Sequence, residues 1–129
     1  MTDNADTISN LYAAFAKGDV PTVLGAFAPN IQWVEADGFP YAGTYVGPDA
    51  VLTGVFMRLA TEWDGFGAVF DEVMGSGETV VAIGNISGTW KATGKHFKAP
   101  TVHVWRFRDG KIANFQEYTD TVLVQRALS

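Results

Sequence analysis

The chain has 129 residues with no cysteine, and its nine basic and fourteen acidic side chains give a formal net charge of −5. A chain of this length forms one domain, residues 1–129, which buries roughly two thirds of the surface that the unfolded chain exposes. The missing cysteines exclude disulfides, thiol catalysis and thiolate metal sites, and the lack of a basic run disfavours nucleic-acid binding. No apolar run approaches the ~18 residues of a membrane span, and the acidic N-terminus is unlike a signal peptide, so we expect a cytoplasmic protein with no membrane association.

Helical spacing of apolar residues predicts three helices in the first half of the chain. The apolar stripe of the first helix is Ile8, Leu11, Tyr12 and Phe15. The second helix begins at the N-cap Asp19, ends at Pro29, and buries Val23, Leu24 and Phe27. The third begins at residues 47–49, and its broad apolar face is Leu52, Val55, Phe56, Leu59 and Trp63.

Alternating apolar and polar residues predict strands over residues 31–35, 66–74, 79–90, 97–108 and 111–118. The dipeptide Asp109-Gly110 is a strong hairpin signal between the last two strands. The stretch 37–47 contains three glycines and is predicted to be a loop. Thr119 or Asp120 then begins a short C-terminal helix.

This order of elements predicts an α+β, cone-shaped fold. Helices gathered at the front of the chain cannot form βαβ crossovers, so the three N-terminal helices must cover one face of a largely antiparallel sheet. A long, strongly curved sheet closed on one side by helices leaves a conical cavity. Gly84 and Gly88 lie inside a predicted strand and fit the bends that such curvature needs.

Most motifs with a known chemistry are missing. The sequence has no Walker A loop, no G-x-G-x-x-G after a strand and no G-x-S-x-G elbow. His96 and His103 are seven residues apart on one predicted strand, so they point to opposite faces and form no metal pair. We therefore predict neither a metal site nor a cofactor.

Strand parity places a few polar side chains among aromatic ones. Glu35 shares a face with Trp33, His103 with Trp105, and Glu117 with Phe115. If these aromatic side chains face the cavity, two carboxylates and an imidazole do so too, and burial would shift their pKa values toward acid/base work near neutral pH. Glu35 could instead be solvated at a sheet end, His103 could be a core residue, Glu117 could only hold His103 in one tautomer, and Asp120 could be a helix N-cap.

The aromatic residues are the predicted walls of the cavity. Those assigned to substrate binding are Tyr12, Trp33, Tyr41, Tyr45, Phe56, Trp63, Trp105 and Phe115. The segment with Tyr41 and Tyr45 is either a lid or a plug. The opposite sheet face carries Val102 and Val104, with Val80 and Ala82 as expected neighbours, and we expect this face to be buried in a homodimer.

Nearly the whole chain resembles the SnoaL-like, ketosteroid isomerase-related branch of the nuclear transport factor 2-like superfamily. The segments that carry the resemblance are Tyr12–Asp19, Phe27–Trp33, Gly43–Val51, Lys91–Lys95, His103–Ile112 and Phe115–Thr121. Members of this superfamily include steroid isomerases, polyketide cyclases, epoxide hydrolases, dehydratases and binding subunits, so the fold does not settle the function.

The resemblance also implies residue roles. The catalytic base of the steroid isomerases falls on Glu35, their carboxylic-acid donor on His103, and their tyrosine donor on Leu11, one residue before Tyr12. The base is thus retained and both donors are lost. The SnoaL-type cyclases use a carboxylate with histidine, and here that carboxylate is Glu35, Glu117 or Asp120. The epoxide hydrolases also need an inward arginine, which the predicted cavity lacks.

The leading hypothesis is a cofactor-free isomerase or cyclase that transfers protons on a small apolar carbonyl compound. Glu35 would remove a proton next to the carbonyl, His103 would bind the enolate oxygen, and Glu117 would orient or charge His103. A non-catalytic ligand-binding or accessory protein would use the same cavity without turnover. A structural dimer would instead have its cavity filled by Phe39 or Tyr41.

Overall fold

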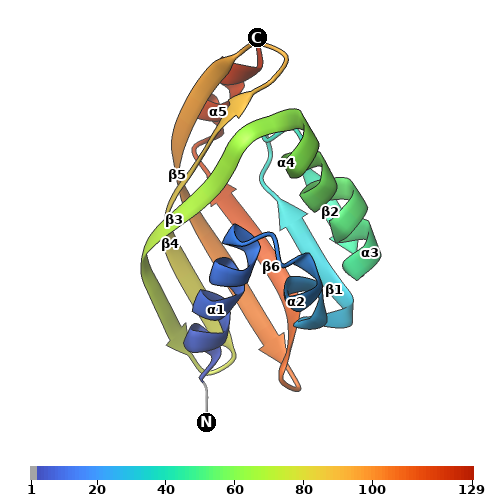
Figure 1. Ribbon diagram of the computed structural model, residues 1–129. Helices are drawn as coiled ribbons and strands as arrows, with labels where there is room; N and C mark the ends of the chain where they lie inside the picture. The colour runs from blue at the N-terminus through green and yellow to red at the C-terminus, as the bar shows by residue number, and fades with distance from the viewer. Residues whose placement is uncertain (1–2) are drawn as a thin grey trace.

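The computed structural model describes residues 3–129 and places a curved sheet behind a layer of helices (Figure 1). The helical elements are α1 (Asn4–Ala16), α2 (Val20–Gly25), α3 (Pro48–Val51), the π-helical turn η1 (Leu52–Phe56), α4 (Met57–Glu62) and α5 (Thr121–Leu128). The strands are β1 (Phe27–Glu35), β2 (Gly43–Val46), β3 (Trp63–Ser76), β4 (Thr79–Trp90), β5 (Lys95–Arg108) and β6 (Lys111–Thr119). The predicted α+β architecture, with helices on one face of a curved sheet and a short C-terminal helix, is confirmed.

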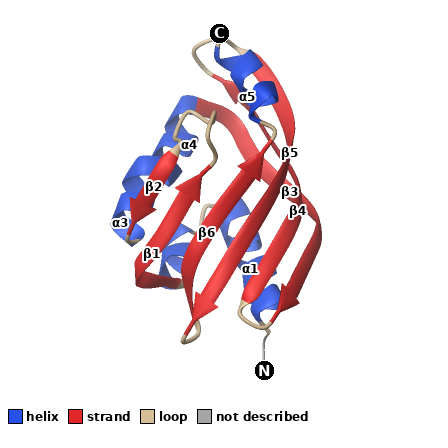
Figure 2. Ribbon diagram, turned by 180° about the vertical axis from the view of Figure 1, so that it is seen from behind, coloured by secondary structure: helices blue, strands red, loops and turns tan. Residues whose placement is uncertain are grey.

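The order of the strands places β1, from the first third of the chain, beside β6, from its last part. Within the described residues the sheet runs β2-β1-β6-β5-β4-β3, and each neighbouring pair is antiparallel except β1 and β6, which are parallel. Helices α1, α2 and α3 lie on one side of this sheet, and seen from the other side most of the sheet is uncovered, with α5 at the upper end of β5 (Figure 2). Because β1 and β6 are parallel, the residues that end both strands lie at the same edge of the sheet.

The second helix is shorter than the sequence predicts. Helix α2 begins as expected, with the Asp19 side chain accepting a hydrogen bond from the Thr22 N–H, but it ends at Gly25. The main-chain N–H of Ile112 donates to Ala26 O, and Phe27 pairs with Ile112, so Phe27 opens β1 instead of closing the helix. Pairing with β6 outweighs the helical spacing of the apolar residues here.

Two further boundaries also differ from the prediction. Residues Gly43–Val46, inside the predicted loop, form the edge strand β2 against β1. Trp63 opens β3 opposite Trp90, whereas its spacing from Leu59 predicts the last turn of a helix. Each segment is short, and main-chain pairing to a neighbouring strand decides its conformation.

A bulge in β3 lies opposite Gly84. The pairing of β3 with β4 shifts between Phe70 and Glu72, and a Cβ added at Gly84 would lie only 2.0 Å from the carbonyl oxygen of Val69. Glycine is therefore required where the two strands approach so closely. The bend expected at this strand glycine is present, and it turns Phe70 toward the helices.

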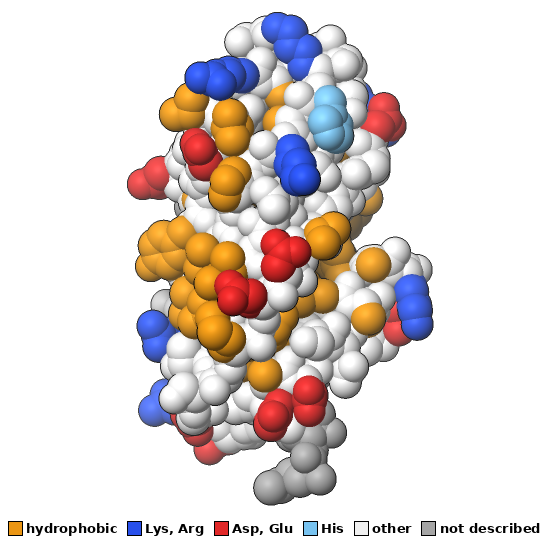
Figure 3. Space-filling model, turned by 90° about the vertical axis from the view of Figure 1, so that its left-hand side faces the viewer, with side chains coloured by type: hydrophobic (Ala, Val, Ile, Leu, Met, Phe, Trp, Pro, Cys, Tyr) orange, Lys and Arg blue, Asp and Glu red, His pale blue; other side chains and the backbone are white. Residues whose placement is uncertain are grey.

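The sheet face away from the helices carries an apolar patch, which we call the outer apolar face. Its members, on β3 to β6, are Met74, Val81, Ile83, Val102, Val104 and Tyr118. The sequence prediction named Val80 and Ala82 as members, and this is wrong: both are fully buried on the inner face, because the register pairs Val104 with Val81. From the side of β3 and β4, hydrophobic side chains gather near the middle of the molecule (Figure 3).

Candidate functional site

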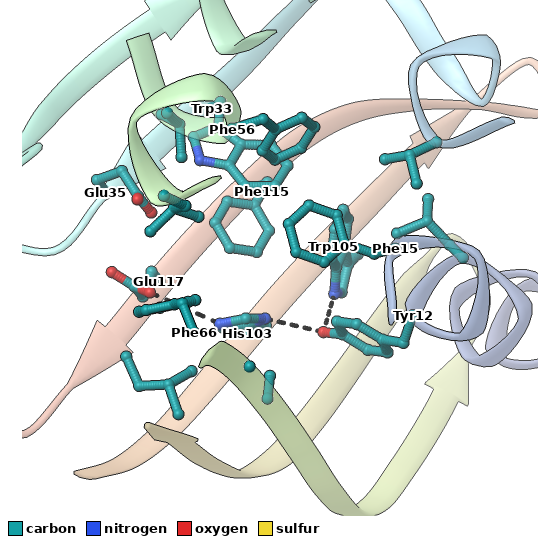
Figure 4. Close-up of a pocket in the computed structure, with 17 residues that line it drawn as sticks. Tyr12, Phe15, Trp33, Glu35, Phe56, Phe66, His103, Trp105, Phe115 and Glu117 are labelled. Atoms are coloured by element: carbon teal, nitrogen blue, oxygen red, sulfur yellow. Dashed lines mark hydrogen bonds and ion pairs between the residues drawn. The ribbon is translucent and has the colours of Figure 1, made fainter. Parts of the chain in front are cut away.

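A small apolar cavity lies between the helices and the inner face of the sheet (Figure 4). It has about 70 Å³ of space open to the centre of a water-sized sphere. The cavity therefore has room for a small ligand or a few waters. Its walls are Leu11, Tyr12, Phe15, Val23, Trp33, Glu35, Val55, Phe56, Leu59, Phe66, Gly67, Ala68, Ile86, His103, Trp105, Phe115 and Glu117.

Aromatic rings pack tightly around the polar groups of the cavity. Trp33 stacks on Phe115 with 3.8 Å between ring centroids, and Trp105 lies 4.6 Å from Phe115. These contacts come from β1, β5 and β6, whose neighbouring positions place the three rings side by side. They fix the polar side chains in a setting of low polarity, where electrostatic interactions are stronger than in water.

A hydrogen-bond chain connects α1 to the sheet. The Trp105 Nε1–H donates to Tyr12 Oη over 2.8 Å, and Tyr12 Oη lies 2.8 Å from His103 Nδ1. Burial raises the pKa of Tyr12 far above its ordinary value, so this hydroxyl keeps its proton across the physiological range.

The other side of the imidazole faces Glu117. His103 Nε2 lies 3.7 Å from Glu117 Oε2, and Glu117 Oε1 accepts a hydrogen bond of 3.2 Å from the Ala36 N–H. The 3.7 Å separation is too long for a hydrogen bond. Among the described residues, His103 Nε2 and Trp33 Nε1 are buried without a hydrogen-bond partner, so both donors are free to bind a ligand atom in the cavity.

Glu35 and Glu117 form a buried carboxyl pair. They are 4% and 5% exposed, and the pairing of Val34 with Gln116 in parallel strands places them at equivalent positions. Burial raises the pKa of Glu35 well above its ordinary value, the negative charge of Glu117 raises it further, and the nearby Trp33 indole opposes the rise without reaching hydrogen-bonding distance. Burying two carboxyl groups so close together disfavours the state in which both are charged.

Two surface hollows adjoin the site. One, of about 290 Å³, lies between α1, α4 and β3, and four of its lining residues also line the cavity: Phe15, Phe56, Leu59 and Phe66. The other, of about 350 Å³, lies at the ends of β1 and β6 and is lined by both Glu35 and Glu117. The first is the nearest route for a ligand, and the second brings solvent close to the carboxyl pair.

The structure brings most of the predicted site residues together. Those that line the cavity are Glu35, His103, Glu117, Tyr12, Trp33, Phe56, Trp105 and Phe115. The resemblance put the isomerase tyrosine at Leu11, and its neighbour Tyr12 nonetheless brings a hydroxyl to His103. Neither Phe39 nor Tyr41 lines the cavity, so neither side chain fills it.

Tyr41, Tyr45 and Trp63 do not line the cavity, contrary to the sequence prediction. Tyr41 Oη donates to Glu62 over 2.6 Å and accepts from the Trp63 indole, while Tyr45 Oη donates to Tyr41 O. These contacts fasten the segment before β2 to α4, so it is neither a lid nor a plug. Trp63 lines only the hollow between α1 and α4.

Asp120 also lies outside the cavity. It occupies the N-cap position of α5, is exposed, and makes no side-chain capping bond, while its main-chain N–H donates to Pro100 O. An offset of three residues from Glu117, at the end of the strand, turns it away from the inner face.

Several wall residues were not predicted as part of the site. They are Leu11, Phe15, Val23, Val55, Leu59, Phe66, Gly67, Ala68 and Ile86. The members that lie on helices were predicted to belong to buried apolar faces, and this burial could have indicated that they line the cavity. Gly67 and Ala68 carry no such signal, because the irregular pairing of β3 between Asp64 and Gly67 changes the residues that face inward.

Neither a metal centre nor a membrane helix is found in residues 3–129. No group of three or more His, Cys, Asp or Glu side chains there lies where it could hold a metal ion. No helix in the same range has the length and apolar character needed to cross a membrane.

Comparison with known proteins identifies close structural relatives. Residues 8–115 match the SnoaL-like domain. An NTF2-like protein from Burkholderia thailandensis is 40% identical, with a TM-score of 0.96 and coverage of 100% of this chain and 99% of that one. An NTF2-like protein of unknown function from Burkholderia pseudomallei is 32% identical, with a TM-score of 0.90 and coverage of 100% and 99%. TerC, co-crystallised with polyporic acid, is 26% identical, with a TM-score of 0.85 and coverage of 96% of each chain. A comparison with curated proteins gave no match.

Proposed function

The chain belongs to the SnoaL-like domain family, and from this membership and the cavity we propose that it is a cofactor-free acid/base catalyst of proton transfer on a small carbonyl compound. The observation that carries the proposal is the buried pair Glu35 and Glu117 beside the unpartnered His103 Nε2. Buried carboxyl groups that hold a proton near neutral pH suit general acid/base catalysis.

The environments of the two carboxyl groups assign their roles. Glu117 accepts a hydrogen bond from the Ala36 N–H and faces His103 Nε2, so we assign it the role of base. Glu35 has the raised pKa, which favours its protonated form, so we assign it the role of acid. The sequence-based hypothesis makes Glu35 the base; in the resting protein that role falls first to Glu117, with Glu35 as its acid partner.

The reaction is a proton shift next to a carbonyl group. The carboxyl pair takes a proton from the carbon beside the carbonyl and becomes neutral, while the electrons of the C–H bond move to the carbonyl oxygen. His103 Nε2–H donates to that oxygen as its charge develops. The pair then returns one proton to carbon, so no external oxidant or cofactor is consumed.

The cavity limits the size of the substrate. The small cavity suits a small ring ketone, and a longer molecule would extend past Phe56 and Leu59 into the adjoining hollow. The relative TerC, co-crystallised with polyporic acid, supports a small organic molecule as the ligand here too.

The test is deuterium exchange of cyclohex-3-enone in D₂O, followed by NMR, together with its conversion to the conjugated enone by ultraviolet absorbance. We expect catalysed exchange by the wild-type protein, reduced roughly 10²–10⁴-fold in Glu35→Gln and Glu117→Gln. Glu78→Gln is the matched control, because Glu78 is exposed in the turn between β3 and β4. Quenching of tryptophan fluorescence by the ketone without any exchange would instead identify a non-catalytic binding protein.

A further inference from the structure

The hydroxyl of Tyr12 lies between two nitrogen atoms on the same strand. Trp105 Nε1 is 2.8 Å from Tyr12 Oη on one side, and His103 Nδ1 is 2.8 Å from it on the other. Figure 4 shows this chain of contacts, which continues from the far side of the imidazole toward Glu117. Both strand residues belong to β5, whereas Tyr12 comes from α1.

The donors and acceptors in this chain can be assigned. An indole nitrogen only donates, so Tyr12 Oη accepts from Trp105. The phenol has one proton of its own, and among the described residues His103 Nδ1 is the acceptor that lies within hydrogen-bonding distance of Tyr12 Oη, so we assign the phenol as the donor to it. Nδ1 must then accept, and the proton of the neutral imidazole belongs on Nε2.

Nε2 is the ring nitrogen of His103 that is available to a ligand in the cavity. It is buried, it has no hydrogen-bond partner among the described residues, and it lies 3.7 Å from Glu117 Oε2. A ligand oxygen placed against His103 therefore meets an N–H donor and not a lone pair. With the opposite tautomer, the same oxygen would be repelled.

Packing holds Tyr12 in place. Its ring stacks on Phe70 with 4.2 Å between centroids and meets the edge of Trp105 at 5.8 Å. Phe70 is the residue that pairs with Gly84 at the bulge in β3. The curvature of the sheet thus positions the phenol that contacts the imidazole.

We infer that Tyr12 is a positioning residue, which holds the proton of His103 on Nε2 by donating its own hydroxyl proton to Nδ1. The consequence for catalysis rests on the proposed function, but the tautomer itself is a property of the free protein. Tyr12 acts through His103 and does not itself donate to the substrate.

The competing explanation is that the negative charge of Glu117 alone draws the proton to Nε2. Nitrogen-15 NMR of the imidazole at neutral pH separates the two explanations. His96 is exposed, and the variant His96→Gln assigns its signals. In the wild-type protein we expect a protonated Nε2 and an unprotonated, hydrogen-bonded Nδ1; a protonated Nδ1 would overturn the inference.

The variant Glu117→Gln removes the charge and keeps Tyr12. We expect the proton to stay on Nε2 in this variant, and we expect both tautomers in the double variant Tyr12→Phe, Glu117→Gln. Loss of the Nε2 tautomer in Glu117→Gln alone would assign the effect to Glu117 and overturn the inference. Because Glu117→Gln keeps Tyr12, this test does not depend on whether a Tyr12 variant folds.

Activity gives a separate readout. Where cyclohex-3-enone exchange is catalysed, we expect Tyr12→Phe to lower kcat by up to roughly a hundredfold with little change in KM. An unchanged kcat would contradict the catalytic consequence. If no exchange is found in the wild-type protein, the proposed function fails, while the NMR result still decides the role of Tyr12.

Discussion

Glu35, the last residue of β1, and Glu117, near the end of the parallel strand β6, follow the paired residues Val34 and Gln116, so that two buried carboxyl groups face one cavity from adjacent strands. The strands are far apart in the sequence, and β6 reaches β1 only after the chain has built the other strands of the sheet. The two carboxyl groups therefore come together only in the folded protein, and the free-energy cost of burying them side by side arises only on folding. Burial and mutual repulsion make the doubly charged state unfavourable.

Because ionising Glu35 is unfavourable in the folded protein, we predict that the stability of the protein depends on pH. The pKa of Glu35 is raised in the folded protein above the ordinary value of 4.5, so the folded state binds the proton more tightly than the unfolded state. The contribution of Glu35 to the free energy of unfolding is therefore fully present below pH 4.5 and is lost as pH rises toward the folded-state pKa, by about 1.4 kcal/mol per pH unit at most.

Urea unfolding from pH 4 to pH 9 measures this effect as a difference between variants. Glu35→Gln is neutral at every pH, so we expect it to gain stability relative to the wild-type protein as pH rises. Glu78→Gln, at an exposed position, should follow the wild-type curve. Parallel curves for wild type and Glu35→Gln would show that Glu35 titrates normally.

Ligand size should depend on the wall between the cavity and the hollow beside α4. Leu59 lines both spaces, whereas Leu52, on the same helical segment, lines neither. We expect Leu59→Ala to open the passage and to tighten binding of ring ketones longer than cyclohexenone, at a cost of about 2–5 kcal/mol in stability. Leu52→Ala is the matched control, and equal effects of both variants on ligand preference, measured by tryptophan fluorescence, would contradict this route.

The sequence correctly predicts which of these residues lie on the inner face of the sheet, because side chains alternate between the two faces along each strand. Glu35, His103 and Glu117 were placed beside Trp33, Trp105 and Phe115, and the structure puts all six in the cavity wall. Alternation of side chains between the two faces needs only local regularity, and the pairing is unbroken over residues 32–34, 101–106 and 114–119.

The remaining assignments depended on contacts between distant segments. Tyr41 was assigned to the cavity from its aromatic character, but its hydroxyl is bound by Glu62 and Trp63. Phe27 left its predicted helix because Ile112 pairs with it. The outward position of Val81 likewise depends on the register of β4 against β5, which local spacing cannot give, since a shift of one residue reverses which side chain faces inward.

The close approach of β3 and β4 predicts that Gly84→Ala is strongly destabilising. The new Cβ would lie 2.0 Å from Val69 O, a main-chain atom that can move only with the bulge. We expect a loss of about 1–3 kcal/mol or more in urea unfolding, and a displaced Phe70 that no longer stacks on Tyr12. Gly67→Ala, which has open space around its Cβ and an ordinary φ, is the control. Equal stability of the two variants would show that the bulge adapts freely.

The outer apolar face predicts a homodimer. Val81, Val104 and Tyr118 lie on the sheet side away from α1, α2 and α3, and pairing two such faces would remove apolar area from water at about 25 cal/mol per Å². A charged side chain at the centre of the outer apolar face would have to be buried in the dimer without an oppositely charged group beside it. We therefore expect the wild-type protein to be a dimer in light scattering after size-exclusion chromatography, and Val104→Glu to be a folded monomer. Val46→Glu, at an exposed position on the edge strand β2, should leave the dimer intact. A monomeric wild-type protein, or dissociation by both variants alike, would rule out this face as the interface.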